Sequence, residues 1–257
     1  MEANTVGFIG GGRITKIFLK AWKNRDVIPG KVVVYDINEE TTSNLRKHYP
    51  SIEVATDLKA VARQNVVFLA LHPPVIMETL DKVAADIGND SILISLAPKI
   101  SCEKISGKVS TKNIARLIPN ATSYINKGFN PLSIMTGCSA NAKAVLMELL
   151  TPLGHTFEVV ERKLEGFAIL SAMLPTYFWF QWDELVKLGP KMELSEEETI
   201  MSIRESLIAA IELMYDYGMK PAEVIDLIPV KPIGASEQQI AEIYQTVLPA
   251  LFEKIKP

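Results

Sequence analysis

The chain has 257 residues, of which 48% are hydrophobic and 22% charged, with a formal net charge of −3 at pH 7. This composition excludes a globally disordered chain, since it provides apolar side chains for a sizeable core. The slight negative charge also argues against a nucleic-acid partner, which typically needs a concentrated basic face. The two cysteines fit a reduced, cytoplasmic setting, and no apolar run predicts a signal peptide or a membrane span.

In the first part of the chain, short β-branched runs alternate with helical patterns. The strand-like runs cover residues 5–10, 31–36, 65–71 and 91–97, each bounded by Gly, Pro, Asn or Asp. Strand and helix in alternation predict a parallel sheet with helices on both faces. Residues 112–119 and 154–161 are candidates to extend this sheet, with a helix from residue 141 that stops near Gly154.

After residue 161 the strand-like runs disappear, and an all-helical second domain is expected. Its candidate helices cover residues 167–188, 195–218, 221–228 and 236–255, with Ser195 and Glu198 forming a capping box and Ser236 capping the last helix. These helices are apolar on more than one face, which indicates burial against a partner subunit. The alternative is a helical layer packed entirely on its own sheet domain.

The run VGFIGGGRIT (residues 6–15) places Gly10, Gly12 and Thr15 at the spacing G-x-G-x-x-G/A, with Thr in the third position. A strand before it and a helix after it are typical of the pyrophosphate-binding turn of a Rossmann fold. Gly10 permits the tight turn and Gly12 permits close approach of the phosphates. Arg13 lies within the glycine loop, where its charge attracts phosphate, and the helical pattern begins at Ile14. The fold class is therefore α/β, a doubly wound parallel sheet followed by a helical domain.

An acidic residue, Asp36, closes the second strand-like run. A carboxylate at this place accepts hydrogen bonds from the adenosine ribose and repels a 2′-phosphate, which favours NAD over NADP. Alternatively, Asp36 only caps the turn that follows the strand. The cofactor expected from the sequence is thus NAD or NADP, with NAD slightly favoured.

Motifs along nearly the whole chain resemble those of pyrroline-5-carboxylate reductases: VGFIGGG, FLALHPP, SLAPKIS, RLIPN and LSAMLPTY, in the same order and at similar intervals. The resemblance implies a Rossmann domain over residues 1–161 and a helical dimerisation and substrate domain over 162–257. It also implies hydride transfer from NAD(P)H to the C=N bond of a cyclic imino acid, as in proline biosynthesis. The implied partners are this small-molecule substrate and a second copy, in a homodimer or a larger assembly of dimers.

The resemblance assigns residues to the cofactor site one motif at a time. His72 and Pro73 stand where the family usually has Lys-Pro, and Asn120 ends the motif RLIPN beside the nicotinamide, although an ordinary turn is an equal interpretation of this residue. With Gly10, Gly12, Arg13, Ile14 and Asp36, the cofactor-binding residues expected are Ala70, His72, Pro73, Ala97 and Asn120.

The substrate motifs depart further from the family. Ala172, Met173 and Leu174 lie in a segment where the family has Ser-Gly-Ser-Gly-Pro-Ala-Tyr. A Ser-Pro-Gly-Gly-Thr-Thr loop, which holds the substrate carboxylate in the family, is replaced by residues 231–236, and the substrate-binding residues expected there are Lys231, Gly234, Ala235 and Ser236. The alternative for Ser236 is a plain helix cap.

Imine reduction needs little from the protein beyond orientation, carboxylate anchoring and a proton, because the cofactor supplies the hydride. Thr176 and Ser236 are the candidate catalytic proton donors, with Tyr177 and His72 as further candidates. No histidine or cysteine lies at metal-ligand spacing, so no metal site is expected. Two functions remain: a reductase of the pyrroline-5-carboxylate type, or a catalytically weakened relative that binds a dinucleotide and acts as an interaction protein.

Overall fold

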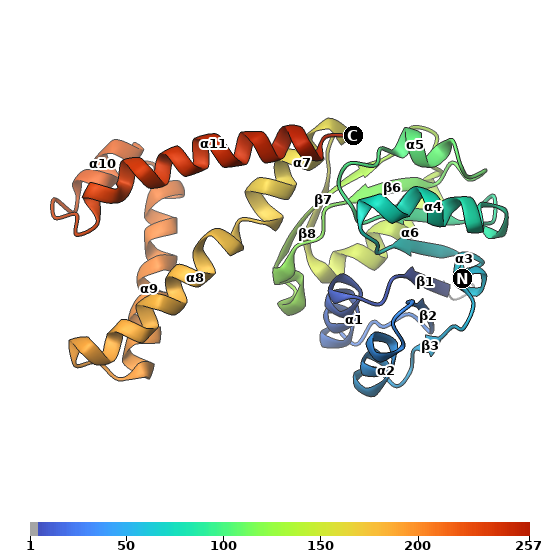
Figure 1. Cartoon of the computed structure of the whole chain (residues 1–257), viewed down its shortest axis with the longest axis horizontal. Helices are drawn as coiled ribbons and strands as arrows, with labels where there is room; N and C mark the ends of the chain where they lie inside the picture. Colours follow the sequence, from blue (N-terminus) through green and yellow to red (C-terminus); the bar gives the residue numbers. More distant parts are fainter. Residues whose placement is uncertain (1–4) are drawn as a thin grey trace. The chain divides into compact units, whose positions relative to one another are not determined.

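The computed structural model describes residues 5–257 and contains two compact units (Figure 1). The first comprises residues 5–172 together with 252–257, and the second comprises residues 173–251. Among the described residues, none of the helices combines the length and apolar character needed to cross a membrane.

The first unit is built on an eight-stranded sheet in the order β3-β2-β1-β4-β5-β6-β7-β8. All neighbouring pairs are parallel except β6 and β7, which are antiparallel. The predicted α/β fold is therefore confirmed, and the two runs expected to extend the sheet contain β6 and β8. The short strand β3 and the strand β7, with its antiparallel pairing to β6, were not predicted. The strands are β1 (Thr5–Ile9), β2 (Lys31–Tyr35), β3 (Glu53–Val54), β4 (Val66–Leu69), β5 (Ile92–Ser95), β6 (Ile114–Leu117), β7 (Gly128–Ile134) and β8 (Gly154–Glu158).

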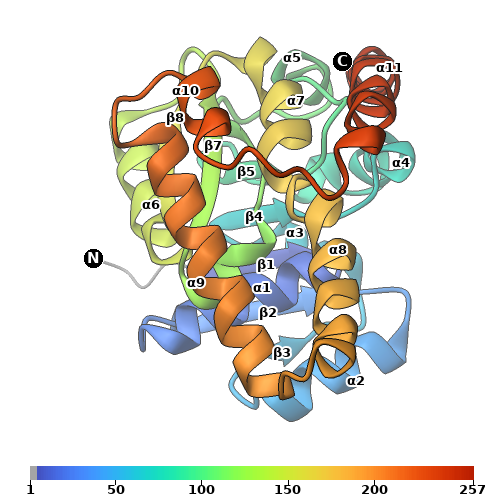
Figure 2. The same cartoon turned by 90° about the vertical axis from the view of Figure 1, so that its left-hand side faces the viewer.

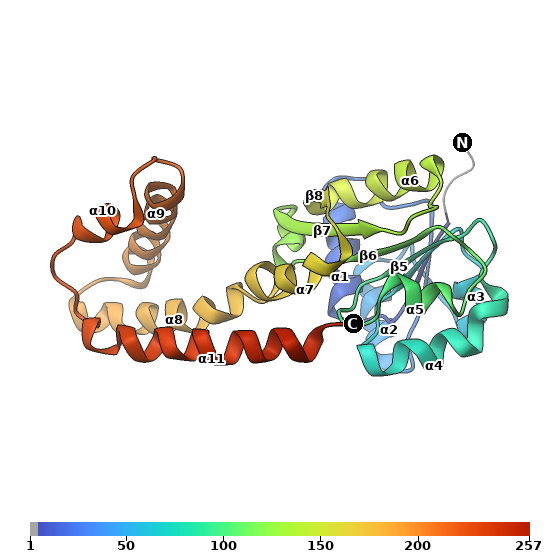
Figure 3. The same ribbon diagram turned by 90° about the horizontal axis from the view of Figure 1, so that it is seen from above.

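Helices cover both faces of this sheet, and Figure 3 shows α6 and α4 on opposite sides of it. The helices of the first unit are α1 (Arg13–Asn24), α2 (Glu39–His48), α3 (Leu58–Ala62), α4 (Pro73–Val83), α5 (Cys102–Ser106), α6 (Ala140–Leu150) and α7 (Leu164–Phe167). Side chains of α1, α2 and α6 pack into one core cluster and those of α3, α4 and α5 into another. Two buried faces explain why the strands are continuous apolar runs rather than alternating ones.

The first cluster is dominated by aromatic rings on β1, α1 and β4. Phe8 stacks on Phe68 with ring centroids 4.7 Å apart, and Phe18 meets both rings at its edge. Trp22 is fully buried beside them and donates its indole N–H to the carbonyl oxygen of Leu149, at 2.8 Å. This packing anchors α1 directly behind β1 and so fixes the turn between them.

The second unit contains α8 (Pro175–Leu188), α9 (Glu196–Tyr215), α10 (Pro221–Asp226) and most of α11 (Glu237–Ile255). Helix α9 contacts both α8 and α10, and Figure 2 shows α9 along its length. The predicted capping box is confirmed: the Ser195 hydroxyl accepts from the Glu198 amide, and the Glu198 carboxylate accepts from the Ser195 amide. No apolar side chain of residues 173–251 is buried, so this described unit has no core of its own.

Two helix predictions are wrong in detail. Residues 167–188 do not form one helix: α7 ends at Phe167, a π-helical turn covers Ala168–Ala172, and α8 begins at Pro175. Proline fixes φ and lacks an amide proton, so it begins the helix at the first position instead of continuing it. Ser236 does not cap α11, because it lies inside a 3₁₀ turn, Gly234–Ser236, that leads directly into this helix.

Candidate functional site

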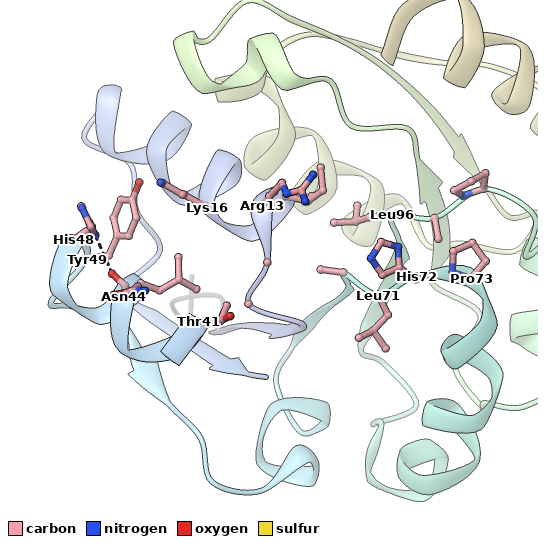
Figure 4. Close-up of a pocket in the computed structure, with 17 residues that line it drawn as sticks. Arg13, Lys16, Thr41, Asn44, His48, Tyr49, Leu71, His72, Pro73 and Leu96 are labelled. Carbon is pink, nitrogen blue, oxygen red and sulfur yellow. Dashed lines mark hydrogen bonds between the residues drawn. The ribbon is translucent and has the colours of Figure 1, made fainter. Parts of the chain in front are cut away.

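A cleft of about 720 Å³ opens where the chain leaves the carboxyl ends of β1, β4 and β5. In a doubly wound sheet, this is the place where ligands bind, because the strand order reverses here: the strands after β1 are added on one side, β2 and β3, and then on the other, from β4 onward. Figure 4 shows Asn44, His48 and Tyr49 at the α2 end of the cleft, and His72 and Pro73 toward the other end. The lining residues are Gly11, Gly12, Arg13, Ile14, Lys16, Thr41, Asn44, Leu45, His48, Tyr49, Ala70, Leu71, His72, Pro73, Leu96, Ala97 and Pro98.

The glycine turn is shaped by contacts with β4. Gly10 has a φ of +107°, and a Cβ added there would meet the carbonyl oxygen of Ala70 at 2.3 Å. The Thr15 hydroxyl donates to the Gly10 carbonyl at 2.6 Å, which closes the turn from inside. Gly10 is therefore required by the backbone, and it lies beneath the cleft instead of lining it.

Gly12 has a different role, because it faces open space. A Cβ at this position would meet nothing within 4 Å, and the backbone angles, φ −71° and ψ −158°, are accessible to other residues. Gly12 is the N-cap of α1, and no side chain caps this helix start. The amide groups of the first helical turn therefore point toward the cleft without a capping acceptor, which is the arrangement that binds a phosphate.

Asp36 lies beside this turn at the end of β2. Its two carboxylate oxygens accept hydrogen bonds from the amides of Gly11, at 2.7 Å, and Asn38, at 2.9 Å. The carboxylate thus orders the glycine loop and also caps the turn after its strand. Asp36 is not among the residues that line the cleft, and its contact with a ribose remains a prediction.

Asn120 is also outside the lining of the cleft and is 4% exposed. Its side-chain oxygen accepts from the amide and hydroxyl of Thr122, so it caps the 3₁₀ turn Ala121–Ile125. Its side-chain amide donates to the Ser171 carbonyl at 3.3 Å. Asn120 therefore acts as a turn residue in this structure, and its contact with a nicotinamide stays a prediction.

The remaining expected cofactor residues gather on the cleft: Arg13 and Ile14 at the start of α1, Ala70, His72 and Pro73 after β4, and Ala97 after β5. The sequence did not predict the opposite wall of the cleft, which is formed by Lys16 on α1, by residues of α2 and by Tyr49 at the end of α2. Tyr49 on that wall is buried, which raises the pKa of its phenol, with a smaller contribution from Tyr124. Lys23 lies over its ring, 5.5 Å from the centroid.

The expected substrate residues belong to the helical unit. Lys231 pairs with Glu237 at 4.0 Å, and Gly234, Ala235 and Ser236 form the turn before α11. The Thr176 hydroxyl donates to the carbonyl oxygen of Met173, just before the start of α8, at 2.6 Å. Among residues 5–257, no group of three or more His, Cys, Asp or Glu side chains is placed to hold a metal ion.

Comparisons with known proteins relate the chain to NAD(P)-binding oxidoreductases. Residues 5–99 match the model of the NADP oxidoreductase, coenzyme F420-dependent family. Pyrroline-5-carboxylate reductase from Haemophilus influenzae is 26% identical and covers 83% of this chain and 79% of its own. The Corynebacterium melassecola enzyme of the same name is 23% identical over 96% of this chain and 93% of its own.

Among solved structures, Plasmodium falciparum pyrroline carboxylate reductase with NADP bound superimposes with a TM-score of 0.79 at 18% identity, covering 100% of this chain and 98% of the other. This structural similarity supports the fold alone, and the evidence for a relationship comes from the sequence comparisons. The chain is thus a distant relative, over most of its length, of pyrroline-5-carboxylate reductases, and its first part matches a family of NADP oxidoreductases.

Proposed function

We propose that this protein is an NAD(P)H-dependent reductase that acts on the C=N bond of a cyclic imino acid such as pyrroline-5-carboxylate. One observation carries the cofactor part of this proposal: the open space at Gly12, in front of a helix start that no side chain caps. The chain fits a dinucleotide there, since a pyrophosphate accepts from such amides and is favoured by the helix dipole. The substrate class follows from the relatives, which are named as reductases of this imine.

In this proposal, the bound cofactor supplies a hydride, and the chain supplies binding and a proton. Arg13 adds positive charge beside the phosphates, while His72, Pro73 and Ala97 bound the half of the cleft beyond β4. The turn at residues 234–236, with Lys231 beside it, holds the substrate carboxylate. Thr176 and Ser236 are the proposed donors of the proton that the substrate nitrogen takes up.

The carboxylate of Asp36 makes NADH the slightly favoured cofactor, although NADPH is also accepted in this proposal. Asp36 is fixed by two amide hydrogen bonds, so it cannot turn away from a ligand at the end of β2 without losing them. A negative charge held there repels a 2′-phosphate. The cationic side chains of Arg13 and Lys16 on the same cleft act in the opposite direction.

We further propose that residues 162–257 form a dimerisation domain and residues 1–161 the cofactor domain. Apolar side chains of the helical unit are widely exposed, including Phe180 at 63%, Ile211 at 56% and Val230 at 71%. A single helical unit without buried apolar side chains gains little hydrophobic stabilisation, and a second copy of the same surface supplies it. The unpaired state of both cysteines supports the cytoplasm as the compartment.

A specific observation favours a second candidate function, a weakened relative that binds a dinucleotide without turnover. Ala172 and Leu174 bring side chains into the segment where the family has glycines, and the Thr176 hydroxyl already donates to Met173. The larger side chains reduce the space available to a substrate, and the hydrogen bond within the chain occupies a hydroxyl that would otherwise donate to it. This protein would then act through its exposed helical surface.

The test combines binding and turnover in the full-length chain. NADH and NADPH are titrated by intrinsic fluorescence, and their oxidation is then followed with pyrroline-5-carboxylate and with related cyclic imines. The reductase proposal expects turnover with at least one imine. Tight cofactor binding without turnover on any of them supports the second function, and no binding of either cofactor refutes both.

A further inference from the structure

A buried charge cluster joins β6 to the segment that precedes the helical unit. Arg116 on β6 is 0% exposed and donates to Glu165 at 2.5 Å and to Glu161 at 3.0 Å. Glu165 is itself 1% exposed. Burying charges is costly unless they are paired, and apolar replacements are often as stable, so stability alone is a weak reason for such a cluster.

The cluster is not complete as an ion-pair network. The Nε atom of Arg116 is buried and has no hydrogen-bond partner among the described residues. An unpaired donor on a buried cation adds a desolvation cost that a purely structural site usually avoids. The two carboxylates of the cluster, in contrast, also accept hydrogen bonds from backbone amides outside the cluster.

Both carboxylates accept from the loop that follows β5. Glu165 accepts from the amide of Lys99 at 3.3 Å, and Glu161 accepts from the amide of Cys102 at 2.7 Å. Lys99 has a φ of +75°, a strained conformation for a residue with a side chain, and it persists only where the surroundings enforce it. The carboxylate that accepts from its amide is one such restraint.

The loop held in this way is a wall of the cofactor cleft. Leu96, Ala97 and Pro98 line the cleft, and Lys99 is the next residue. In a doubly wound fold with Asp36 on the adenosine side, at β2, the nicotinamide half of a dinucleotide extends toward β4 and β5. A connection therefore runs from Arg116 through Glu165 and Lys99 to the wall beside the nicotinamide.

We propose that Arg116 and Glu165 are positioning residues, which hold residues 96–98 against the nicotinamide half of the dinucleotide. Arg116 fixes the Glu165 carboxylate, and Glu165 fixes the Lys99 amide. This inference rests on the proposed function, because it requires a dinucleotide in the cleft. It adds a role for a cluster that no step of imine reduction uses.

The test compares two ligands by calorimetry: NADPH, and 2′-phospho-ADP-ribose, which lacks the nicotinamide. Glu165→Met removes the acceptor of the Lys99 amide and leaves Arg116 paired with Glu161, so the buried charge stays compensated. The loss of one charge-assisted hydrogen bond predicts an NADPH Kd about tenfold weaker, with the fragment Kd unchanged within about twofold. Glu165→Gln keeps an acceptor oxygen and restores most of the NADPH affinity.

Asp81→Asn is the matched control, since it breaks the exposed Lys108–Asp81 ion pair of the same unit and is expected to leave both Kd values unchanged. If Glu165→Met does not fold, the double variant Arg116→Met/Glu165→Met replaces it, because it removes both charges together. NADPH binding as tight as wild type in the folded variant, or an equal loss for both ligands, overturns the inference. If the wild type binds NADH but not NADPH, the same comparison is made with NADH and ADP-ribose. Failure of the wild type to bind either cofactor refutes the proposed function instead.

Discussion

Replacing Gly12 with valine separates cofactor binding from folding. A Cβ at this position meets nothing within 4 Å, and φ is negative and the backbone extended, so the position does not require glycine. The fold therefore tolerates the change. Valine caps a helix less well than glycine, but it also lowers the conformational entropy of the unfolded chain, and the two effects offset each other. The free energy of unfolding thus stays within about 1 kcal/mol of wild type.

The same side chain occupies the space in front of the first turn of α1. A pyrophosphate kept away from these amides loses at least two charge-assisted hydrogen bonds, each worth about 1.5 to 3 kcal/mol. Together they amount to about 3 to 6 kcal/mol, so the Kd for NADH and NADPH rises by about 100-fold or more. Fluorescence titration of each cofactor, next to urea unfolding, measures both quantities on the same sample.

Gly30→Val is the matched control, because Gly30 also has nothing within 4 Å of its Cβ position and lies outside the cleft. It is expected to bind both cofactors as the wild type does. An unchanged NADH affinity in Gly12→Val refutes the placement of the pyrophosphate at this turn.

Three further predictions concern the same unit. Asp36→Ala shifts the ratio of NADPH to NADH affinity toward NADPH by about tenfold, and an unaltered ratio counts against the ribose contact. Gly10→Ala lowers the free energy of unfolding by about 2 to 5 kcal/mol, because its Cβ meets Ala70; denaturation as stable as wild type contradicts this. Burial, and secondarily Glu161, raise the pKa of the Cys102 thiol to about 12. The unfolded thiol ionises first, so stability falls above about pH 9 by up to about 1.4 kcal/mol per pH unit. In Cys102→Ala, the free energy of unfolding declines less steeply above this pH than in the wild type. If the two proteins lose stability in parallel, the Cys102 thiol is not the cause.

The sheet domain was predictable because its signals are local. A β-branched run bounded by Gly, Pro, Asn or Asp identified β1, β2, β4 and β5, and apolar runs identified β6 and β8. The two-residue strand β3 and the strand β7, which has Asn130 and Pro131 inside it, were not predicted. The glycine turn was equally readable, since its spacing and its flanking strand and helix lie within one continuous segment. The capping box of α9 depends on residues only three positions apart.

The rest depended on contacts between distant residues. Lys16 and Tyr49 have ordinary helical positions in the sequence, and only the packing of α1 and α2 places them on one cleft. Arg116 and Glu165 are far apart along the chain, and nothing in either local sequence indicates their pairing. The division at residues 168–174 was missed because a π-helical turn of five residues is too short to alter the helical spacing of the apolar run around it.

The three tryptophans give each unit its own optical reporter. Trp22 is sealed within the aromatic cluster of the sheet, whereas Trp179, on α8, is 46% exposed. An aqueous quencher such as acrylamide reaches Trp179 and, less fully, the partly exposed Trp182 of the same helix, and it spares Trp22, so the emission that resists quenching comes mainly from the sheet unit. Loss of order in the helices and loss of order in the sheet therefore become separately visible in one unmodified sample.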